Sequence, residues 1–587
     1  MFNRVLVANR GEIALRVMRA CRELGFWTVA VYSEADRDSL HVHYADEAFL
    51  IGPPPAVDSY LRIDTIIAVA RQAHVDAIHP GYGFLAENAA FARACVAAGI
   101  VFIGPSATAM ERMGSKIAAR REATHANVPL VPGTTAPVTS AEAARLLGEQ
   151  FGYPIALKAA SGGGGRGLKV AHAPGEVEEA FQSSRREAAA YFKDDTVYVE
   201  KYLMNPRHIE IQILADQHGT VLALGERDCS VQRRHQKLLE EAPSPVMTPE
   251  VRTSMQAAAV RLCEQVGYVG AGTLEFLWSD GQFYFLEMNT RIQVEHTVTE
   301  AITGLDLVKW QLRIAQGEPL PYTQHDIVLR GHAIECRINA EDPAANFAPS
   351  LGTLASYAEP HGLGVRVDTG FKAGSTIPQF YDSLIAKLIT WGSDRPEALA
   401  RMVRALSDFE ISGVKTTIPF HQLLLRNPAF VRGEATVRFI EDHIGEAGLH
   451  ALATPPIMGD DFDEFNGARR FAVEVNGKRF TVRVAVPEDL LANDAVQRQP
   501  ASYVPHAAKR SKAPTAPGTL VAPLQGTVVT IRVAPGDMLQ VGQVVAVVEA
   551  MKMENEVVAT HAGRVKAVLV QPGQSVQAGM SLVTLEV

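Results

Sequence analysis

Residues 287–295 read Glu-Met-Asn-Thr-Arg-Ile-Gln-Val-Glu, so polar and apolar side chains alternate along the whole stretch. In an extended chain, side chains two positions apart point the same way. A solvent-facing strand would also alternate, but the preceding Phe-Tyr-Phe-Leu is apolar on both faces and favours a segment that enters the interior. Buried carboxylates and an arginine need charged partners, which a metal ion and an anionic substrate would supply. The polar groups expected on this one face are Glu287, Asn289, Arg291, Gln293 and Glu295.

Glu275 can be placed relative to Glu287 through the turn between their strands. A three-residue loop, Ser279-Asp280-Gly281, ending in a left-handed glycine is a favoured hairpin connection. Glu287 would then oppose Thr273, and Glu275 would lie on the same face as Glu287. A two-residue loop would put the two glutamates on opposite faces. We therefore predict the three-residue register, because it pairs two hard oxygen ligands suited to Mg²⁺ (or Mn²⁺).

Outward from this stretch, the chain opens with a β-α-β pattern. Residues 4–8 and 28–32 are predicted as buried strands, with a helix over 11–24 between them. This order is typical of an α/β protein with a doubly wound parallel sheet. No G-x-G-x-x-G follows the first strand, so we do not predict a dinucleotide site.

A glycine-rich loop lies between two further predicted strands. Residues 161–167 read Ser-Gly-Gly-Gly-Gly-Arg-Gly. Consecutive glycines let backbone N–H groups approach phosphate oxygens and let a loop close as a lid. A flexible surface turn would explain the glycines equally well.

The pattern of apolar and polar residues changes after about residue 447. Residues 471–486 alternate around Asn476-Gly477, which predicts a type I′ hairpin. Residues 487–518 hold five prolines and are predicted to be a semi-flexible linker.

Residues 519–587 contain an internal repeat. Gly526, the pair Pro535-Gly536 and Gly542 each recur 37 residues later. Short β-rich segments separate these glycines, which predicts a small all-β domain of two similar halves. Lys552, within Ala-Met-Lys-Met, falls at the joint on a predicted tight turn. A lone lysine is ordinarily a solvated surface residue, but two methionines exposed on a turn need a partner.

Composition limits the function classes. The 587 residues suggest three to five domains, and the net charge of −9 without a basic stripe argues against a nucleic-acid binder. Five cysteines, an odd number without a CxxC pair, argue against a disulfide framework or structural zinc and fit a cytoplasmic protein. Asn3 and Arg4 interrupt the N-terminus, so no signal peptide is expected. No run of about 20 apolar residues predicts a membrane span.

Six stretches together resemble the biotin carboxylases, a family of ATP-grasp enzymes, over residues 1 to about 446. In chain order they are VLVANRGEIA, HPGYGFLAEN, SGGGGRG, ERDCSVQRRHQK, EMNTRIQVEH and GHAIECRINAEDP. The last 70 residues or so resemble the biotin carboxyl carrier family, because Met-Lys-Met replaces the Asp-Lys-Ala usual in the related lipoyl domains.

The resemblance implies a division into domains. The first is an N-terminal biotin carboxylase domain of the doubly wound pre-ATP-grasp type (1–113). It is followed by an ATP-grasp domain (114–330) with a mobile lid (about 131–203) and a C-terminal α+β biotin carboxylase domain (331–446). The hairpin and linker (447–518) then lead to an all-β biotinyl domain (519–587).

The resemblance also implies roles for single residues. The ATP phosphates would be held by Lys116, Lys158 and the loop glycines Gly163, Gly164, Gly165 and Gly167. Adenine would be contacted by Glu200, Lys201 and Leu203, and the nucleotide pocket lined by His208, Gln232 and His235. The metal would be bound by Glu275 and Glu287, with Asn289 close by. Bicarbonate would be bound by Lys237, Arg291, Gln293 and the backbone of Val294. Glu295 would be the base, Arg337 would stabilise carboxyphosphate and the biotin enolate, Tyr82 and Asp382 would contact biotin, and Lys552 would carry it.

The implied function is ATP- and bicarbonate-dependent carboxylation of biotin on Lys552. The carboxyl group would pass to a separate carboxyltransferase (β) subunit with acetyl-CoA or propionyl-CoA as its acceptor, as in fatty acid biosynthesis. A biotin protein ligase is a further expected partner. The chain is also expected to form a homo-oligomer through its biotin carboxylase body, residues 1 to about 446. The segment 447–518 is shorter than the assembly domain usual in propionyl-type α-chains, which favours a shorter acetyl/propionyl-type subunit.

Two alternatives stay open. One is the biotin carboxylase subunit of a two-subunit pyruvate carboxylase. The other is a carrier protein whose body has lost activity, against which intact Lys237, Glu295 and Arg337 argue.

Overall fold

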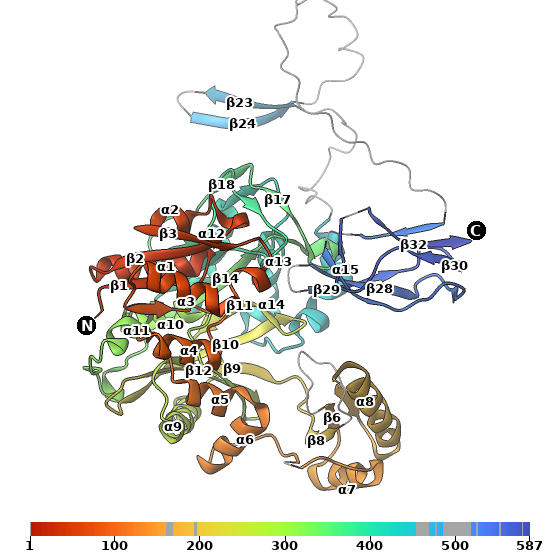
Figure 1. Ribbon diagram of the computed structural model, residues 1–587, viewed down its shortest axis with the longest axis horizontal. Helices are drawn as coiled ribbons and strands as arrows, with labels where there is room; N and C mark the ends of the chain where they lie inside the picture. The colour runs from red at the N-terminus through yellow and green to blue at the C-terminus, as the bar shows by residue number, and fades with distance from the viewer. Residues whose placement is uncertain are drawn as a thin grey trace, which may run out of the picture. The chain divides into compact units, whose positions relative to one another are not determined.

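The computed structural model describes residues 2–134, 136–159, 168–192, 196–453, 469–475, 478–484, 518–523, 526–550, 553–577 and 579–586 (Figure 1). The chain divides into two compact units, one holding residues 1–453 and the other most of the rest. Among the described residues, no helix is both long and apolar enough to cross a bilayer.

The N-terminal part is the predicted doubly wound sheet. Five parallel strands follow the order β3-β2-β1-β4-β5. Their bounds are β1 (Arg4–Val7), β2 (Trp27–Ser33), β3 (Glu47–Gly52), β4 (Ala77–His79) and β5 (Val101–Phe102). The covering helices are α1 (Gly11–Glu23), α2 (Leu40–Tyr44), α3 (Ile63–Gln72), α4 (Ala89–Ala97) and α5 (Ala107–Gly114). Glu12 in the first turn of α1 and Tyr82 in the loop after β4 both line the cleft described below, so one end of this sheet borders it.

An eight-stranded antiparallel sheet forms the centre of the body, in the order β13-β12-β9-β10-β11-β14-β21-β19. Its strands are β9 (Arg207–Ala215), β10 (Val221–Arg233), β11 (Gln236–Ala242), β12 (Gly270–Ser279), β13 (Gln282–Asn289), β14 (His332–Asn339), β19 (Val365–Thr369) and β21 (Leu384–Gly392). Because β11 pairs with β14, one continuous sheet contains strands from both sides of the boundary predicted between residues 330 and 331. Helices around it are α6 (Lys116–His125), α9 (Pro249–Val266), α10 (His296–Thr303), α11 (Leu307–Ala315), α12 (Arg395–Asp408), α13 (Ile418–Arg426), α14 (Pro428–Val431) and α15 (Gly445–Ala451).

Strand β9 shows how the sheet separates core from site. Ile209, Ile211 and Ile213 are fully buried in one hydrophobic cluster with residues of α9. The alternate residues Glu210 and Gln212 point to the opposite face. Every residue of β9 is buried, so its polar face meets other protein groups instead of water.

A smaller unit occupies the range predicted as the lid. Three antiparallel strands, β7 (Leu168–Ala171), β6 (Ile155–Ala159) and β8 (Val197–Lys201), pack with α7 (Ala141–Phe151) and α8 (Val177–Phe192). Leu157, Phe181 and Val199 are fully buried members of its own core.

The predicted register of the β12–β13 hairpin is wrong. Ser279 pairs with Gln282, so the loop is the two residues Asp280 and Gly281, both with positive φ. A bulge between Phe276 and Glu275 then shifts the register by one residue, because Phe276 opposes Phe285 while Glu275 opposes Glu287. The glutamates share a face as expected, but through the bulge.

The extended chain predicted over 287–295 is correct only in part. Strand β13 ends at Asn289, and an irregular segment leads to α10. Ile292 still turns into the core while Arg291 and Gln293 reach the site, so the alternation of polar and apolar side chains survives without the strand.

Residues 519–587 form the predicted all-β domain of two halves. Two four-stranded sheets have the orders β25-β32-β30-β27 and β29-β28-β26-β31. The strands are β25 (Thr519–Val521), β26 (Gly526–Ile531), β27 (Met538–Leu539), β28 (Val544–Ala550), β29 (Met553–Val558), β30 (Gly563–Val568), β31 (Ser575–Val576) and β32 (Ser581–Glu586). Strands β26, β27 and β28 begin 37 residues before β30, β31 and β32, so each sheet is the counterpart of the other. Residues 551 and 552, with the turn predicted there, lie outside the described residues.

The predicted hairpin is also present. Strands β23 (Arg469–Val475) and β24 (Lys478–Val484) pair antiparallel, with Val475 opposite Lys478. The turn residues 476–477 and the linker expected over 487–518, except Gly518, are outside the described residues.

Candidate active site

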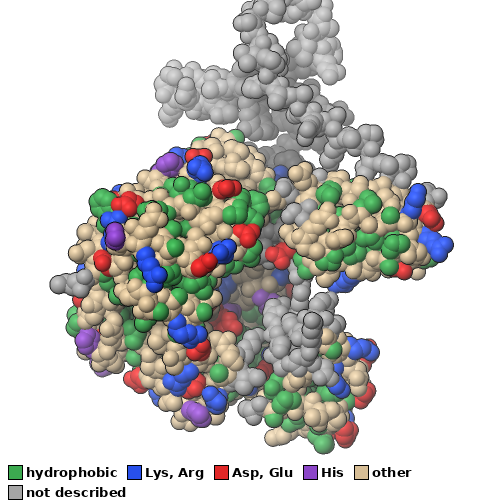
Figure 2. Space-filling model, in the orientation of Figure 1, with side chains coloured by type: hydrophobic (Ala, Val, Ile, Leu, Met, Phe, Trp, Pro, Cys, Tyr) green, Lys and Arg blue, Asp and Glu red, His purple; other side chains and the backbone are tan. Residues whose placement is uncertain are grey.

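A cleft of about 1320 Å³ lies in the body. Figure 2 shows a hollow in this face, with charged side chains at its floor. The cleft is lined by every predicted site residue whose side chain is described. These are Tyr82, Lys158, Glu200, Lys201, Leu203, His208, Gln232, His235, Lys237, Glu275, Glu287, Asn289, Arg291, Gln293, Val294, Glu295, Arg337 and Asp382. Outside the described residues lie the side chain of Lys116 and the whole of Gly163, Gly164, Gly165, Gly167 and Lys552.

The floor of the cleft is a row of charges across four neighbouring strands. Strand pairing places Glu287 opposite Glu275, Glu275 opposite Glu210, and Glu210 opposite Arg227. Directly opposed side chains share a face of the sheet and repel when their charges are alike. Three carboxylates in a row therefore need cations around them.

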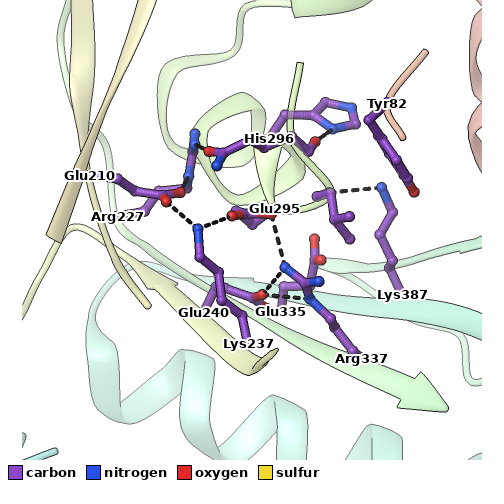
Figure 3. Close-up of polar contacts among 12 residues, drawn as sticks. Tyr82, Glu210, Arg227, Lys237, Glu240, Glu295, His296, Glu335, Arg337 and Lys387 are labelled. Atoms are coloured by element: carbon purple, nitrogen blue, oxygen red, sulfur yellow. Dashed lines mark hydrogen bonds and ion pairs between the residues drawn. The ribbon is translucent and has the colours of Figure 1, made fainter. Parts of the chain in front are cut away.

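Lys237 supplies the main positive charge (Figure 3). Its Nζ donates to Glu210 at 2.5 Å, to Glu275 at 2.8 Å and to Glu295 at 2.6 Å. Burial alone would lower the pKa of Lys237, but these carboxylates raise it well above its ordinary value. Lys237 thus stays charged at the centre of three acidic groups.

A strained turn brings Lys237 to this point. Strands β10 and β11 pair Gln232 with Lys237 across a two-residue turn, Arg234-His235. Both turn residues have positive φ, 48° and 64°. Such turns normally use glycine or asparagine, and strain of this kind tends to gather at functional sites.

Arg337 on β14 closes the far side of the floor. Its guanidinium bonds Glu240 at 2.6 Å and Glu295 at 2.9 Å (Figure 3). Burial alone would raise the pKa of Glu295, but Lys237, Arg337 and Arg227 outweigh it and hold the pKa below its usual range. Burial raises the pKa of Glu240 to about 8 despite the adjacent Arg337. Glu295 is therefore the ionised carboxylate between two cations.

The predicted metal ligands form a set of hard oxygens. Glu275 and Glu287 lie opposite each other, and Asn289 donates to Glu275 at 2.9 Å. Lys237 and His208, whose Nε2 lies 3.0 Å from Glu275, overcome the effect of burial and keep the pKa of Glu275 well below its ordinary value. Two carboxylates and an amide oxygen at one end of a cleft fit Mg²⁺ or Mn²⁺.

Arg291 is held by a residue that we did not predict. Glu87 accepts from the Arg291 Nε at 2.9 Å and from the Thr290 backbone N–H at 2.8 Å. Arg291 also donates to the side chain of Asn289 at 3.0 Å. Glu87 lies in the stretch HPGYGFLAEN, but no periodicity linked it to residue 291.

Three further buried residues, Glu210, Gln212 and Arg227, were missed. Arg227 is fully buried and bonds Glu210 at 2.5 Å, Gln293 at 2.7 Å and Gln212 at 2.6 Å. Alternation of Glu210 and Gln212 with three isoleucines on β9 was a usable signal, since it has the same period as the row 287–295. Arg227 had no such signal.

The side of the cleft predicted to bind the nucleotide is built by the three-stranded unit and α6. The Glu200 carboxylate accepts hydrogen bonds from the Lys158 ammonium at 2.5 Å and from the Arg120 guanidinium at 2.7 Å. Lys201 points its ammonium to the backbone carbonyls of Gly152 and Tyr153 at 2.7 and 2.9 Å. Glu200 and Lys158 thus present a paired charge to the cleft, while Lys201 has its charge committed elsewhere.

The two residues predicted to contact biotin lie at another part of the lining. The Tyr82 hydroxyl donates to Glu12. Asp382 is exposed, and its carboxylate accepts from the Leu384 backbone N–H at 3.2 Å.

A multi-stranded antiparallel sheet, a smaller three-stranded unit bearing a lysine and a glutamate, and a cleft crowded with carboxylates and cations define an ATP-grasp ligase. Four family models match the chain. They are "Biotin carboxylase, N-terminal domain" (residues 1–110), "Carbamoyl-phosphate synthase L chain, ATP binding domain" (115–323), "Biotin carboxylase C-terminal domain" (335–442) and "Biotin-requiring enzyme" (516–585).

Three individual proteins show how far the similarity extends. The "Biotin-dependent acyl-coenzyme A carboxylase alpha3 subunit" of Mycobacterium leprae is 44% identical over 594 residues, covering 99% of this chain and 98% of its own. A pyruvate carboxylase subunit of Methanothermobacter thermautotrophicus is 56% identical, covering 76% of this chain and 90% of its own. The biotin carboxylase domain dimer of Hydrogenobacter thermophilus 2-oxoglutarate carboxylase, solved with MgADP, ADP and bicarbonate, is 49% identical with a TM-score of 0.71, covering 76% of this chain and 98% of its own.

The chain belongs to the biotin carboxylase family and carries a biotinyl domain on the same polypeptide. It is an ATP-dependent carboxylase that uses biotin, ATP, Mg²⁺ and bicarbonate. The predicted family, fold class, enzyme class and cofactors are thereby confirmed.

Proposed function

We propose that the chain carboxylates biotin on Lys552 and passes the carboxyl group to a separate carboxyltransferase (β) subunit that acts on acetyl-CoA or propionyl-CoA. The observation that supports this acceptor is the end-to-end match with an acyl-CoA carboxylase α subunit, biotinyl domain included. The alternative is a subunit of a two-subunit pyruvate carboxylase. Its support is the higher identity of the body to a pyruvate carboxylase subunit, over 76% of the chain.

Bicarbonate is bound, in this proposal, by Lys237, Arg291, Gln293 and the Val294 backbone, and Glu295 takes its proton. In the free protein Lys237 and Arg337 both contact Glu295, and their charges disfavour a proton there. An anion that engages these cations neutralises part of their charge, so the proton affinity of Glu295 rises when bicarbonate is present. The base therefore becomes competent when its substrate arrives.

ATP occupies the side of the cleft near Lys158 and Glu200. Lys158, Lys116 and the loop glycines contact its phosphates, Glu200, Lys201 and Leu203 lie at adenine, and His208, Gln232 and His235 line the pocket. The Lys201 ammonium donates to two carbonyls and its backbone N–H donates to the Pro132 carbonyl, so we assign the contact with adenine to the Lys201 backbone carbonyl. Glu275, Glu287 and Asn289 would hold Mg²⁺ (or Mn²⁺), which, when bound, offsets the charge of the phosphates.

Arg337 stabilises the negative charge of carboxyphosphate, since its guanidinium faces the cleft beside Glu295. Deprotonated bicarbonate attacks the γ-phosphate of ATP and releases ADP, which gives carboxyphosphate. Carboxyphosphate breaks into CO₂ and phosphate, the phosphate takes the ureido proton of biotin, and the ureido nitrogen bonds to CO₂. Tyr82 and Asp382 orient the biotin ring. Closure of the lid over residues 131–203 excludes water from carboxyphosphate.

We further propose the domain boundaries 1–113, 114–330, 331–446, 447–518 and 519–587, which the ranges of the four family models support. A biotin protein ligase modifies Lys552 in the cytoplasm, and the body forms a homo-oligomer. The dimeric biotin carboxylase domain of 2-oxoglutarate carboxylase supports the last point.

The test is to purify the biotinylated protein with its natural partner and to assay bicarbonate-dependent ATP hydrolysis with four acceptors. We expect turnover with acetyl-CoA or propionyl-CoA and none with pyruvate or 2-oxoglutarate. Turnover with pyruvate alone would select the alternative. The absence of ATP hydrolysis dependent on bicarbonate and biotin would overturn the proposed roles in the body.

A further inference from the structure

A second set of buried charges lies behind the cleft. Lys387 on β21 has no exposed surface, and strand pairing places it between Arg337 on β14 and Asp368 on β19. These three side chains form a row on one face, as Glu287, Glu275 and Glu210 do farther along the sheet. None of the roles proposed above uses Lys387.

Lys387 reaches the segment that carries the proposed base. Its Nζ donates to the Val294 carbonyl at 2.9 Å, a contact drawn as a dashed line in Figure 3. The preceding carbonyl, that of Gln293, accepts from the His296 side chain at 2.8 Å. Both peptide groups that flank Val294 are therefore held in place, which sets the direction of the Val294 N–H and the start of Glu295.

Lys387 also reaches the opposite wall. Its Nζ lies 3.3 Å from a carboxylate oxygen of Glu12, which is 5% exposed and lies in the first turn of α1. That carboxylate accepts the hydroxyl of Tyr82. Lys387 and Glu12 thus connect the Val294 segment with the loop that bears Tyr82.

The pair costs free energy to bury. A buried ion pair repays the loss of hydration only in part, and apolar residues of similar size often stabilise a fold as well or better. Lys387 also faces Asp368 at 3.9 Å, so its charge sits in a larger acidic environment. A pair that adds little stability but fixes the direction of two loops is suited to positioning.

We propose that Lys387 and Glu12 are positioning residues for the two substrates, with Lys387 fixing the Val294 peptide beside bicarbonate and Glu12 fixing Tyr82 beside biotin. This inference rests on the proposed function. It assigns each residue a different substrate, which a merely structural role would not do.

The first test is steady-state kinetics of free-biotin carboxylation by Lys387→Met. We expect KM for bicarbonate to rise at least tenfold while KM for ATP stays within twofold, because the nucleotide contacts lie on other elements. Lys387→Arg, which keeps a donor and a charge, should recover part of the loss. Lys415→Met, at an exposed lysine of the same body, is the matched control and should behave as wild type.

The second test keeps its value if Lys387→Met does not fold, because Glu12→Gln and Tyr82→Phe keep the size of both side chains. Each should raise KM for free biotin about three- to tenfold. The double variant should show no rise beyond that of Tyr82→Phe, since phenylalanine removes the hydrogen bond that glutamine, an uncharged acceptor, only weakens.

The outcomes separate the two ideas. If the wild type lacks bicarbonate-dependent turnover, the proposed function fails and this inference fails with it. Wild-type turnover with equal increases in the three KM values in every variant, or with a change in melting temperature alone, overturns this inference and leaves the proposed function standing.

Discussion

Charged side chains are buried throughout the body, whereas the buried side chains among the described residues of 519–587 are all apolar. In the body, Glu210, Arg227 and Lys387 each have no measurable exposure. Arg227 donates to Glu210, and Lys387 forms an ion pair with Glu12. In the biotinyl domain, Val528, Val545 and Leu582 fill a core between two short sheets. The body therefore buries fixed charges, whereas the described core of the biotinyl domain is packed from apolar side chains.

The difference follows from where the chemistry takes place. Fixed charges stabilise a developing negative charge best when they need not reorganise during reaction, which requires burial and mutual hydrogen bonds. A carrier needs only a stable platform for one modified residue. Apolar packing supplies that platform without a costly polar network. Activity of the body should therefore depend on many buried residues, and activity of the carrier on one.

The largest effect is expected from Lys552→Arg. Arginine keeps the charge but offers no amine for the amide bond to biotin, so carboxylation of protein-bound biotin should be abolished. Carboxylation of free biotin should stay within twofold of wild type, because the cleft is untouched. Both are measured as bicarbonate-dependent ATP hydrolysis, with and without added biotin. A comparable loss of the free-biotin reaction would mean that the carrier contributes to the cleft itself.

Glu295→Gln should lower kcat for both free and attached biotin by about 10²–10⁴-fold, the range for loss of a general base. Glutamine keeps the shape, and Lys237 still has Glu210 and Glu275 as partners, so the protein should fold and bind ATP. Turnover is checked by phosphate release and ATP binding by calorimetry. Wild-type turnover would remove the role of base from Glu295.

Periodicity predicted five residues of the cleft, Glu287, Asn289, Arg291, Gln293 and Glu295, and the family resemblance supplied most of the others. Glu287 to Glu295 alternate in the sequence, and the alternation persisted after the strand ended at Asn289. The same period at Glu210 and Gln212 went unused. A β-bulge leaves no periodic trace, so the register of Glu275 was wrong although its face was right. Glu87, Arg227 and Lys387 reach the site through tertiary contacts across the chain, which local patterns do not encode.

The 37-residue repeat predicted the two similar halves of the biotinyl domain, since β26, β27 and β28 begin 37 residues before β30, β31 and β32. Leu582 and its counterpart Val545 are both fully buried. Leu582→Ala should destabilise the biotinyl domain by about 2–5 kcal/mol, through lost burial and a cavity. Differential scanning calorimetry of the whole chain should show one transition lowered and the transition of the body unchanged. A joint shift would show that the two units unfold together.

The smallest effect concerns pH and a histidine in the body. His421 on α13 is fully buried, and burial lowers its pKa to about 4. In the unfolded chain a histidine titrates near 6.5, so between these values the unfolded state binds more protons. The contribution of His421 to stability is therefore complete above pH 6.5 and is lost as pH falls toward 4. At pH 5.5 the loss is roughly 1 kcal/mol.

The variant His421→Gln removes this titration and leaves all others in place, including Glu335, whose pKa burial raises to about 7 with the opposite sign. The difference in urea-unfolding free energy between wild type and variant should therefore shift by roughly 1 kcal/mol in favour of the variant from pH 7.5 to pH 5.5. His561→Gln in the biotinyl domain is the matched control. Its side chain is exposed, in contrast to that of His421. An equal shift for both variants would refute the contrast between a body that buries titratable groups and the described residues of 519–587, whose buried side chains are apolar.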